Sequence, residues 1–229
     1  MNRQLTVASL HHALIRHMMD RGFAPTRFEL ADRFGVTPDQ IARSLEALRD
    51  DHGVVLHPHV PEVWVVHPFS TAPTLFVVRR GDRAWWGNCA WCSLGIAALL
   101  GGDAVTIDTN LGAEGQPVTV HVDRGLVREE LWVHFPIPMA RAWDNVIYTC
   151  STMLIFDSEA AIGGWSERHA IPRGDVRPIQ RVYDFAAVWY GRHLDPEWRK
   201  WTVEEARSMF ERFGLEGPVW QLPHTAERF

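Results

Sequence analysis

The three cysteines of this chain lie in two short segments. Cys89 and Cys92 share the segment N-C-A-W-C-S-L-G, and Cys150 follows in I-Y-T-C-S-T-M-L-I-F. If the first segment is helical, the i, i+3 spacing puts both sulfur atoms on one face, about one turn apart, where a third thiolate from a strand could meet them. Converging thiolates are ligands for a soft cation or a carbon-bound heavy metal. We therefore predict a soft-metal site formed by Cys89, Cys92 and Cys150.

Three thiols in a chain of this length are also compatible with roles other than soft-metal binding. Free cysteine is often buried as a small apolar residue, so plain packing is a simple alternative. Structural zinc sites usually close with four ligands, and no second C-x₂-C or H-x₃₋₅-H follows the first pair. A disulfide between Cys89 and Cys92 is disfavoured because their stretch is apolar and no signal peptide is recognised. Soft-metal binding and packing remain as the two interpretations.

The composition is typical of a globular protein, and we expect its ligand to be a small molecule. Of the 229 residues, 46% are hydrophobic and 22% are charged, which is enough for one good core and a small second domain. The longest apolar stretch, near Gly95–Leu100, is far shorter than the roughly 20 residues that span a bilayer. The net charge of −5 provides no general positive field for nucleic-acid phosphates. We expect a cytoplasmic protein with no membrane partner, and DNA is disfavoured as a ligand.

Residues 1–70 are predicted to form a winged-helix-like N-terminal domain. Thr37 is a good N-cap with Pro38 at the first helical position, and Gly35 ends the helix before them. Three helices and two extended runs are expected, at 10–18, 27–34, 38–50, 54–56 and 63–66. This order makes a winged-helix, metal-responsive transcription regulator an alternative function. The acidic Asp39 and Glu46 on the expected recognition helix count against it, because they would repel phosphates.

Residues 71–229 are predicted to form an α+β domain, a mixed or antiparallel sheet with flanking helices. A strand at Thr74–Val78 precedes a helix over Ala84–Leu100, which carries two of the cysteines and stops at Gly101. Further strand-like runs are expected at 104–108, 118–122, 131–135 and 147–156. Strict alternation in the last run would place Cys150 on one face with apolar Leu154, which suits a site for an apolar organic group.

Several of these segments together resemble the alkylmercury (organomercurial) lyase family. They are the block W-C-S-L at Trp91–Leu94, the segment around Asn110–Val120, and the run T-C-S-T-M-L-I-F-D-S at Thr149–Ser158, all after a wing-bearing N-terminal unit. In that family one cysteine follows a tryptophan at a helix start and a second lies on a later strand. Cys92 and Cys150 match those positions. The resemblance covers roughly residues 5–182, and the Trp-rich C-terminal extension from Trp189 has no counterpart in it.

The resemblance implies protonolysis of a carbon–mercury bond. Two thiolates, Cys92 and Cys150 here, would coordinate the metal, while a carboxyl group removes thiol protons and delivers one to the bound carbon. The hydrocarbon leaves and mercuric ion stays on sulfur. No cofactor is required, and the soft metal, mercury or copper, arrives with the substrate or as a bound ligand. The implied partners are an organometallic or other small organic substrate and low-molecular-weight thiols.

The chain departs from the family at one catalytic position. The family's aspartate lies three residues after the first cysteine, where this chain has Gly95. Cys89 is the favoured replacement, because it lies one turn before Cys92 and a thiol can release its proton as sulfur binds a metal. Asp157, just past the Cys150 run, is a second candidate. A Gly95→Asp substitution is expected to direct a carboxyl group to the face that carries the thiols.

Gly95 leaves open whether the chain is an active lyase. The first function is protonolysis of a carbon–mercury or related carbon–metal bond by Cys92 and Cys150, with Cys89 or Asp157 in place of the missing acid. The alternative is a homologue that binds a soft metal, mercury or copper, or that performs a different small-molecule reaction. The regulator described above is the third.

Overall fold

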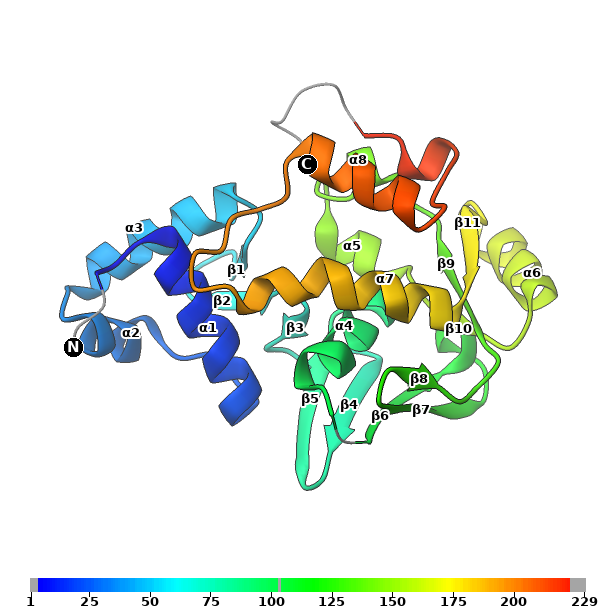
Figure 1. The fold of residues 1–229 in the computed structure, drawn as a ribbon, viewed down its shortest axis with the longest axis horizontal. Helices are drawn as coiled ribbons and strands as arrows, with labels where there is room; N and C mark the ends of the chain where they lie inside the picture. Colours follow the sequence, from blue (N-terminus) through cyan, green and yellow to red (C-terminus); the bar gives the residue numbers. More distant parts are fainter. Residues whose placement is uncertain (1–3, 103, 223–229) are drawn as a thin grey trace.

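The structure, a computed structural model, describes residues 4–102 and 104–222 and has an α+β fold (Figure 1). Within these residues, the larger sheet has the strand order β1-β2-β3-β5-β4-β6-β7-β8 and the smaller sheet has the order β10-β9-β11. Neighbouring strands are antiparallel in both sheets. The predicted fold class, antiparallel sheets with flanking helices, is confirmed.

The elements have the following bounds. The α-helices are α1 (Val7–Arg21), α2 (Arg27–Phe34), α3 (Pro38–Asp50), α4 (Ala90–Leu100), α5 (Val146–Ser151), α6 (Glu159–His169), α7 (Ile179–Gly191) and α8 (Val203–Arg212). The strands are β1 (Val55–Leu56), β2 (Val63–Val66), β3 (Phe69–Ser70), β4 (Phe76–Arg80), β5 (Arg83–Gly87), β6 (Val105–Asn110), β7 (Pro117–Asp123), β8 (Leu126–Val127), β9 (Trp132–Phe135), β10 (Ile155–Phe156) and β11 (Asp175–Pro178). Short 3-10 turns are η1 (Leu111–Ala113), η2 (Met139–Arg141), η3 (Arg192–Leu194) and η4 (Pro218–Trp220).

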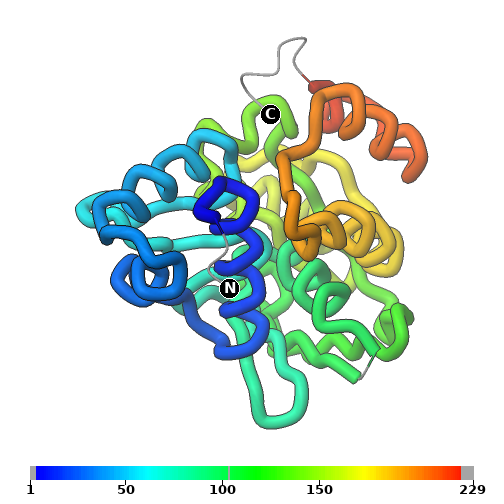
Figure 2. Tube along the Cα trace, turned by 60° about the vertical axis from the view of Figure 1, so that its left-hand side comes forward, coloured from blue at the N-terminus to red at the C-terminus, as the bar shows by residue number. Residues whose placement is uncertain are grey.

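The N-terminal helices begin and end where local capping chemistry requires it. Thr6, Thr26 and Thr37 each accept the amide of the third helical residue, whose side chain bonds back to the cap. Gly22 and Gly35 end α1 and α2 with φ of 82° and 67°, in the left-handed region that favours glycine. Helix α1 then packs against α3 on one side and η3 on the other (Figure 2). The helices and the β1–β2 pair follow the predicted order, and the winged-helix description stays a prediction.

The larger sheet runs from these N-terminal elements into the rest of the chain. Strand β3 pairs with β2 through Ser70 and Val65, and with β5 through Ser70 and Trp86. The predicted domain boundary at residue 70 therefore falls inside a continuous hydrogen-bonded sheet. The division into domains stays a prediction.

Helix α4 forms the centre of the molecule. It lies on β4, β5 and β6 of the larger sheet, and α7 packs across it (Figure 1). The helix starts at Ala90, so the predicted start at Ala84 is wrong. The intervening residues form β5 because the two tryptophans alternate: Trp85 is buried and donates to the Met18 carbonyl (2.7 Å), whereas Trp86 is partly exposed. The strand turns into the helix through Asn88 and Cys89.

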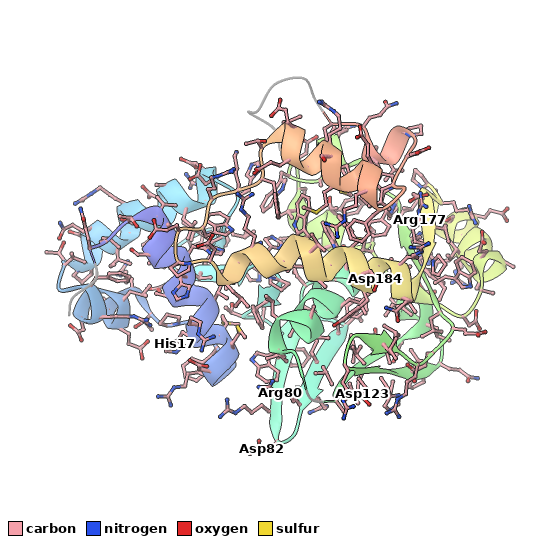
Figure 3. The ribbon with its side chains drawn as sticks, in the orientation of Figure 1. His17, Arg80, Asp82, Asp123, Arg177 and Asp184 are labelled. Atoms are coloured by element: carbon pink, nitrogen blue, oxygen red, sulfur yellow. The ribbon has the colours of Figure 1, made fainter. Side chains whose placement is uncertain are left out.

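Several charged side chains lie at turns and sheet edges. Asp82 occupies the tip of the β4–β5 hairpin, and Asp123 precedes the turn from β7 to β8 (Figure 3). At the edge of the smaller sheet, Arg177 pairs with Asp175 (2.6 Å). None of the described helices combines the length and the apolar character needed to cross a membrane.

Buried His134 on β9 predicts a pH dependence of stability. Its ring is fully buried against Phe156 and Trp165, and burial lowers its pKa from 6.5 to about 4. Between pH 6.5 and pH 4 the unfolded chain binds a proton at His134 that the folded chain does not bind. The contribution of neutral, buried His134 to the free energy of unfolding is therefore complete above pH 6.5 and is lost as the pH falls toward 4. The free energy of unfolding should fall by roughly 3 kcal/mol through this group.

The measurement is urea unfolding between pH 7 and pH 4. His134→Leu should show a shallower decline in stability than the wild type, and exposed His59→Leu should retain the wild-type decline. Parallel curves for the wild type and His134→Leu would contradict the assignment.

Candidate active site

Cys89 and Cys92 lie at the start of α4. Cys89 is the N-cap, and its Sγ accepts the backbone amide of Cys92 at 3.3 Å. A sulfur thus takes the place that a serine or aspartate oxygen usually has at an N-cap. The predicted one-turn spacing is present, although only Cys92 lies inside the helix.

Cys150 lies on a helix, so the strand predicted over 147–156 is wrong in its first half. The Asn145 side chain accepts the Tyr148 amide (3.0 Å) and starts α5, and the Thr149 hydroxyl donates to the Ala142 carbonyl (3.0 Å). This local capping outweighs the strand tendency of the β-branched residues. Only Ile155–Phe156 remain as β10. Cys150 therefore reaches the site from the last turn of a short helix.

The structure brings the sulfur atoms of Cys92 and Cys150 together with a ring nitrogen of His67. These three ligand atoms lie within 4.8 Å of one another, and all three residues are buried. The Nδ1 of His67 is 3.9 Å from the Cys92 Sγ, and its Nε2 has no hydrogen-bond partner in the described part of the chain. His67 was not predicted, because a single histidine on the turn between β2 and β3 carries no spacing signal.

The third thiol, Cys89, lies behind this pair. It shares side-chain hydrogen bonds with Cys150 and Cys92, and its Sγ contacts the Met153 Sδ at 3.8 Å. Cys89 is fully buried and is absent from the walls of the cavity onto which the other two thiols open. The three thiols form one cluster in which Cys92 and Cys150 face the cavity and Cys89 does not.

The surroundings shift the pKa values of the three thiols in opposite directions. Burial raises the pKa of Cys92, but hydrogen bonds from its neighbours outweigh burial and hold that pKa well below its usual value. These neighbours are Cys150, Cys89 and His67. The pKa of Cys150 is raised by its hydrogen bonds to the other thiols and by burial, and burial raises the pKa of Cys89. Cys92 is therefore the sulfur that ionises first.

The cavity beside Cys92 and Cys150 is small and mostly aromatic. Its volume is about 100 Å³. Its aromatic walls come from Trp91, Trp143, Trp189, Tyr190, Trp198 and Trp201. Most of these residues belong to α7 and to the Trp-rich extension that the sequence resemblance could not place. An apolar organic group fits such walls, and two charged residues, Asp51 and Lys200, also line the cavity.

Tyr190 is the second site residue that the sequence did not reveal. Its hydroxyl lies 3.3 Å from the Cys92 Sγ, and its ring stacks at an angle against Trp91 and His193, with centroids 5.4 Å away in each case. It follows Cys92 by 98 positions, so no local pattern connects the two. An amphipathic helix over 179–191 was the available signal, and it does not distinguish a functional tyrosine from a core one.

Two predictions about the missing acid concern Asp157 and Gly95. Asp157 is exposed, accepts a hydrogen bond from the Ser158 hydroxyl (3.1 Å) and lines a separate hollow with Trp165. The structure thus does not bring Asp157 to the thiols. A Cβ at Gly95 would lie 2.2 Å from Cδ2 of Tyr190, so the Tyr190 ring already fills the space that a Gly95→Asp side chain would enter.

Comparisons with known proteins agree on one family. The family model described as MerB: Alkylmercury lyase matches residues 69–191, which is more than half of the chain. Among solved structures, the crystal structure of the mercury-bound form of MerB2 superimposes with a TM-score of 0.64 at 18% sequence identity, covering 82% of this chain and 91% of that one. No curated protein sequence matches the chain.

The matched segment contains both cavity-facing cysteines, Gly95 and Tyr190, and the structural match extends the shared fold beyond it. The chain belongs to the alkylmercury lyase family.

Proposed function

We propose that this protein cleaves the carbon–mercury bond of organomercurials by protonolysis, with Cys92 and Cys150 as the ligands to mercury. The observation that supports this most is a buried pair of thiols, within 4.8 Å of each other, on the wall of an aromatic cavity. Thiolates are the ligands that a soft metal prefers, and apolar walls suit the organic group that the metal carries. The structural relative MerB2 has a mercury-bound form.

The reaction begins at the sulfur that ionises first. The Cys92 thiolate attacks mercury in R–Hg–SR′ and displaces the small thiolate, and Cys150 becomes the second sulfur ligand as the Hg–C bond breaks. The carbon takes up a proton, the electron pair of the Hg–C bond forms the new C–H bond, and R–H leaves. Counted from two neutral cysteines, R–Hg–SR′ and two thiols give R–H, HSR′ and mercury held by two sulfurs. Excess small thiol then removes the mercury.

Cys89 supports the pair in this proposal. Its thiol stays protonated because it is buried, and it donates toward the Cys92 sulfur while accepting the Cys92 amide. It thereby favours the thiolate form of Cys92 and fixes its position on the first turn of α4. A direct role of Cys89 as proton donor to the substrate is less favoured, since Cys89 does not line the cavity.

A second candidate function is binding of a soft metal ion without turnover. The residues that could bind a metal ion favour this function. Among the described residues, His67 and Cys150 lie close to Cys92 as possible metal ligands, and this group contains no carboxylate. Two sulfurs and an imidazole nitrogen suit mercury or copper(I). In this case the protein would hold the ion, and the cavity would serve another small organic molecule.

The first prediction here separates the two functions. The reduced protein, incubated with methylmercury and phenylmercury and excess small thiol, should release methane and benzene, measured by gas chromatography. Cys92→Ser and Cys150→Ser should each reduce release to the uncatalysed level, because a hydroxyl is a poor ligand for mercury. A wild type inert on both substrates would leave metal binding as the better assignment.

The second prediction concerns metal stoichiometry. The reduced protein should retain one mercuric ion per chain after gel filtration in the presence of a weak competing thiol, measured by elemental analysis. The Cys92→Ser/Cys150→Ser double variant should retain none, whereas Cys89→Ser should still retain one, since serine is a good N-cap and Cys89 lies behind the cavity. Loss of the ion in Cys89→Ser would instead indicate a three-thiol site.

A further inference from the structure

Tyr190 is placed where a proton donor for the reaction has to be. It lies on α7, near the end that crosses α4, and it is 3% exposed. Its hydroxyl lies 3.3 Å from the Cys92 Sγ, closer than the His67 Nδ1 at 3.9 Å. Tyr190 also lines the cavity that would hold the organic group, so it is adjacent both to the Cys92 sulfur and to the space for the carbon.

Tyr190 and Gly95 fit each other as a pair. A Cβ at Gly95 would lie 2.2 Å, 2.6 Å and 2.9 Å from Cδ2, Cε2 and Cγ of the Tyr190 ring. The Tyr190 ring is buried and packs against Trp91 and His193, which leaves it little room to shift for a side chain at position 95. The phenol therefore occupies the space that a side chain one turn after Cys92 would enter. The glycine at this position permits the close approach of α7.

Resting on the proposed function, we propose that Tyr190 delivers the proton to the carbon of the bound organomercurial, in the space that a carboxyl group at position 95 would otherwise fill. The O–H bond of Tyr190 breaks, its proton joins the carbon, and the electron pair of the Hg–C bond becomes the C–H bond. The phenolate then takes the thiol proton of Cys150 as the Cys150 sulfur binds mercury. No group outside the site is needed, and the phenol is restored.

The alternative donors within the described residues are less well placed. The Cys89 thiol is screened from the cavity, and Asp157 belongs to a different hollow. A phenol is ordinarily protonated at neutral pH, and the Tyr190 hydroxyl lies within hydrogen-bonding distance of the Cys92 sulfur, so its oxygen can donate toward a Cys92 thiolate. The imidazole of His67 is farther from the sulfur.

The test is single-turnover hydrocarbon release from phenylmercury by Tyr190→Phe, which keeps the ring over Gly95 and removes only the hydroxyl. The rate should fall roughly 10²- to 10⁴-fold, as for loss of a positioned acid, while one mercuric ion per chain is still retained. Tyr183→Phe, on the same helix, is the matched control and should keep the wild-type rate. Wild-type release in Tyr190→Phe would overturn the inference alone, whereas an inert wild type would overturn the proposed function and the inference with it.

A second experiment tests whether the phenol and a carboxyl group compete for one space. Gly95→Asp alone should be overpacked and lose thermal stability, because its Cβ meets the Tyr190 ring. In a Tyr190→Ala background the ring is gone, and adding Gly95→Asp should raise hydrocarbon release at least about tenfold over Tyr190→Ala. A double variant that binds mercury but is no faster than Tyr190→Ala would contradict the shared position.

Discussion

The geometry of the site depends on two glycines, Gly87 and Gly95, which allow β5 and α7 to approach α4 closely. On the sheet side, a Cβ at Gly87 would lie 2.1 Å from the Ser93 hydroxyl oxygen, so β5 can press directly against the helix. On the opposite side, Gly95 lets the Tyr190 ring of α7 do the same. All residues of α4 except Ala98 are buried as a result. Such a helix cannot rotate or slide without creating overlaps or cavities, and the direction of the Cys92 sulfur is fixed with it.

Enclosure of α4 also explains the electrostatics of the thiols. In apolar surroundings a thiolate is costly, and it persists only where several donors point at it. Cys92 has such donors in two thiols and a neighbouring imidazole, and their hydrogen bonds lower the pKa of Cys92. A sulfur prepared in this way is a stronger metal ligand than an exposed thiol, which is mostly protonated at neutral pH. The walls that exclude water thus help both to select an apolar group and to activate the sulfur.

The sequence was sufficient for features that depend on neighbouring residues. Thr37, Pro38 and Gly35 give the ends of their helices, as the sequence predicted. The meeting of Cys92 and Cys150 came from spacing combined with family resemblance. Local patterns failed where two tendencies competed: the run around Cys150 is rich in β-branched residues but is capped as a helix by Asn145.

The remaining site residues could not be read from the sequence because they act through contacts between distant segments. His67 precedes Cys92 by 25 positions and Tyr190 follows it by 98. The glycine at position 95 looked like a lost side chain when considered alone. The structure shows that the Tyr190 ring occupies the space beside this glycine, which the sequence alone does not indicate.

Residues outside the segment that matches the family help to form the cavity, and this limits how small a functional fragment could be. The recognisable segment of the family spans 69–191, but the cavity also takes walls from Asp51, His52 and His67 before it and from Trp198 and Trp201 after it. A fragment trimmed to the recognisable segment would expose the aromatic cavity to water and lose one ring nitrogen beside Cys92. The smallest fragment with a complete cavity is therefore larger than the segment that sequence similarity identifies. Grafting Cys92 and Cys150 with their two helices onto another protein would transfer the two thiols without the buried surroundings that lower the pKa of Cys92.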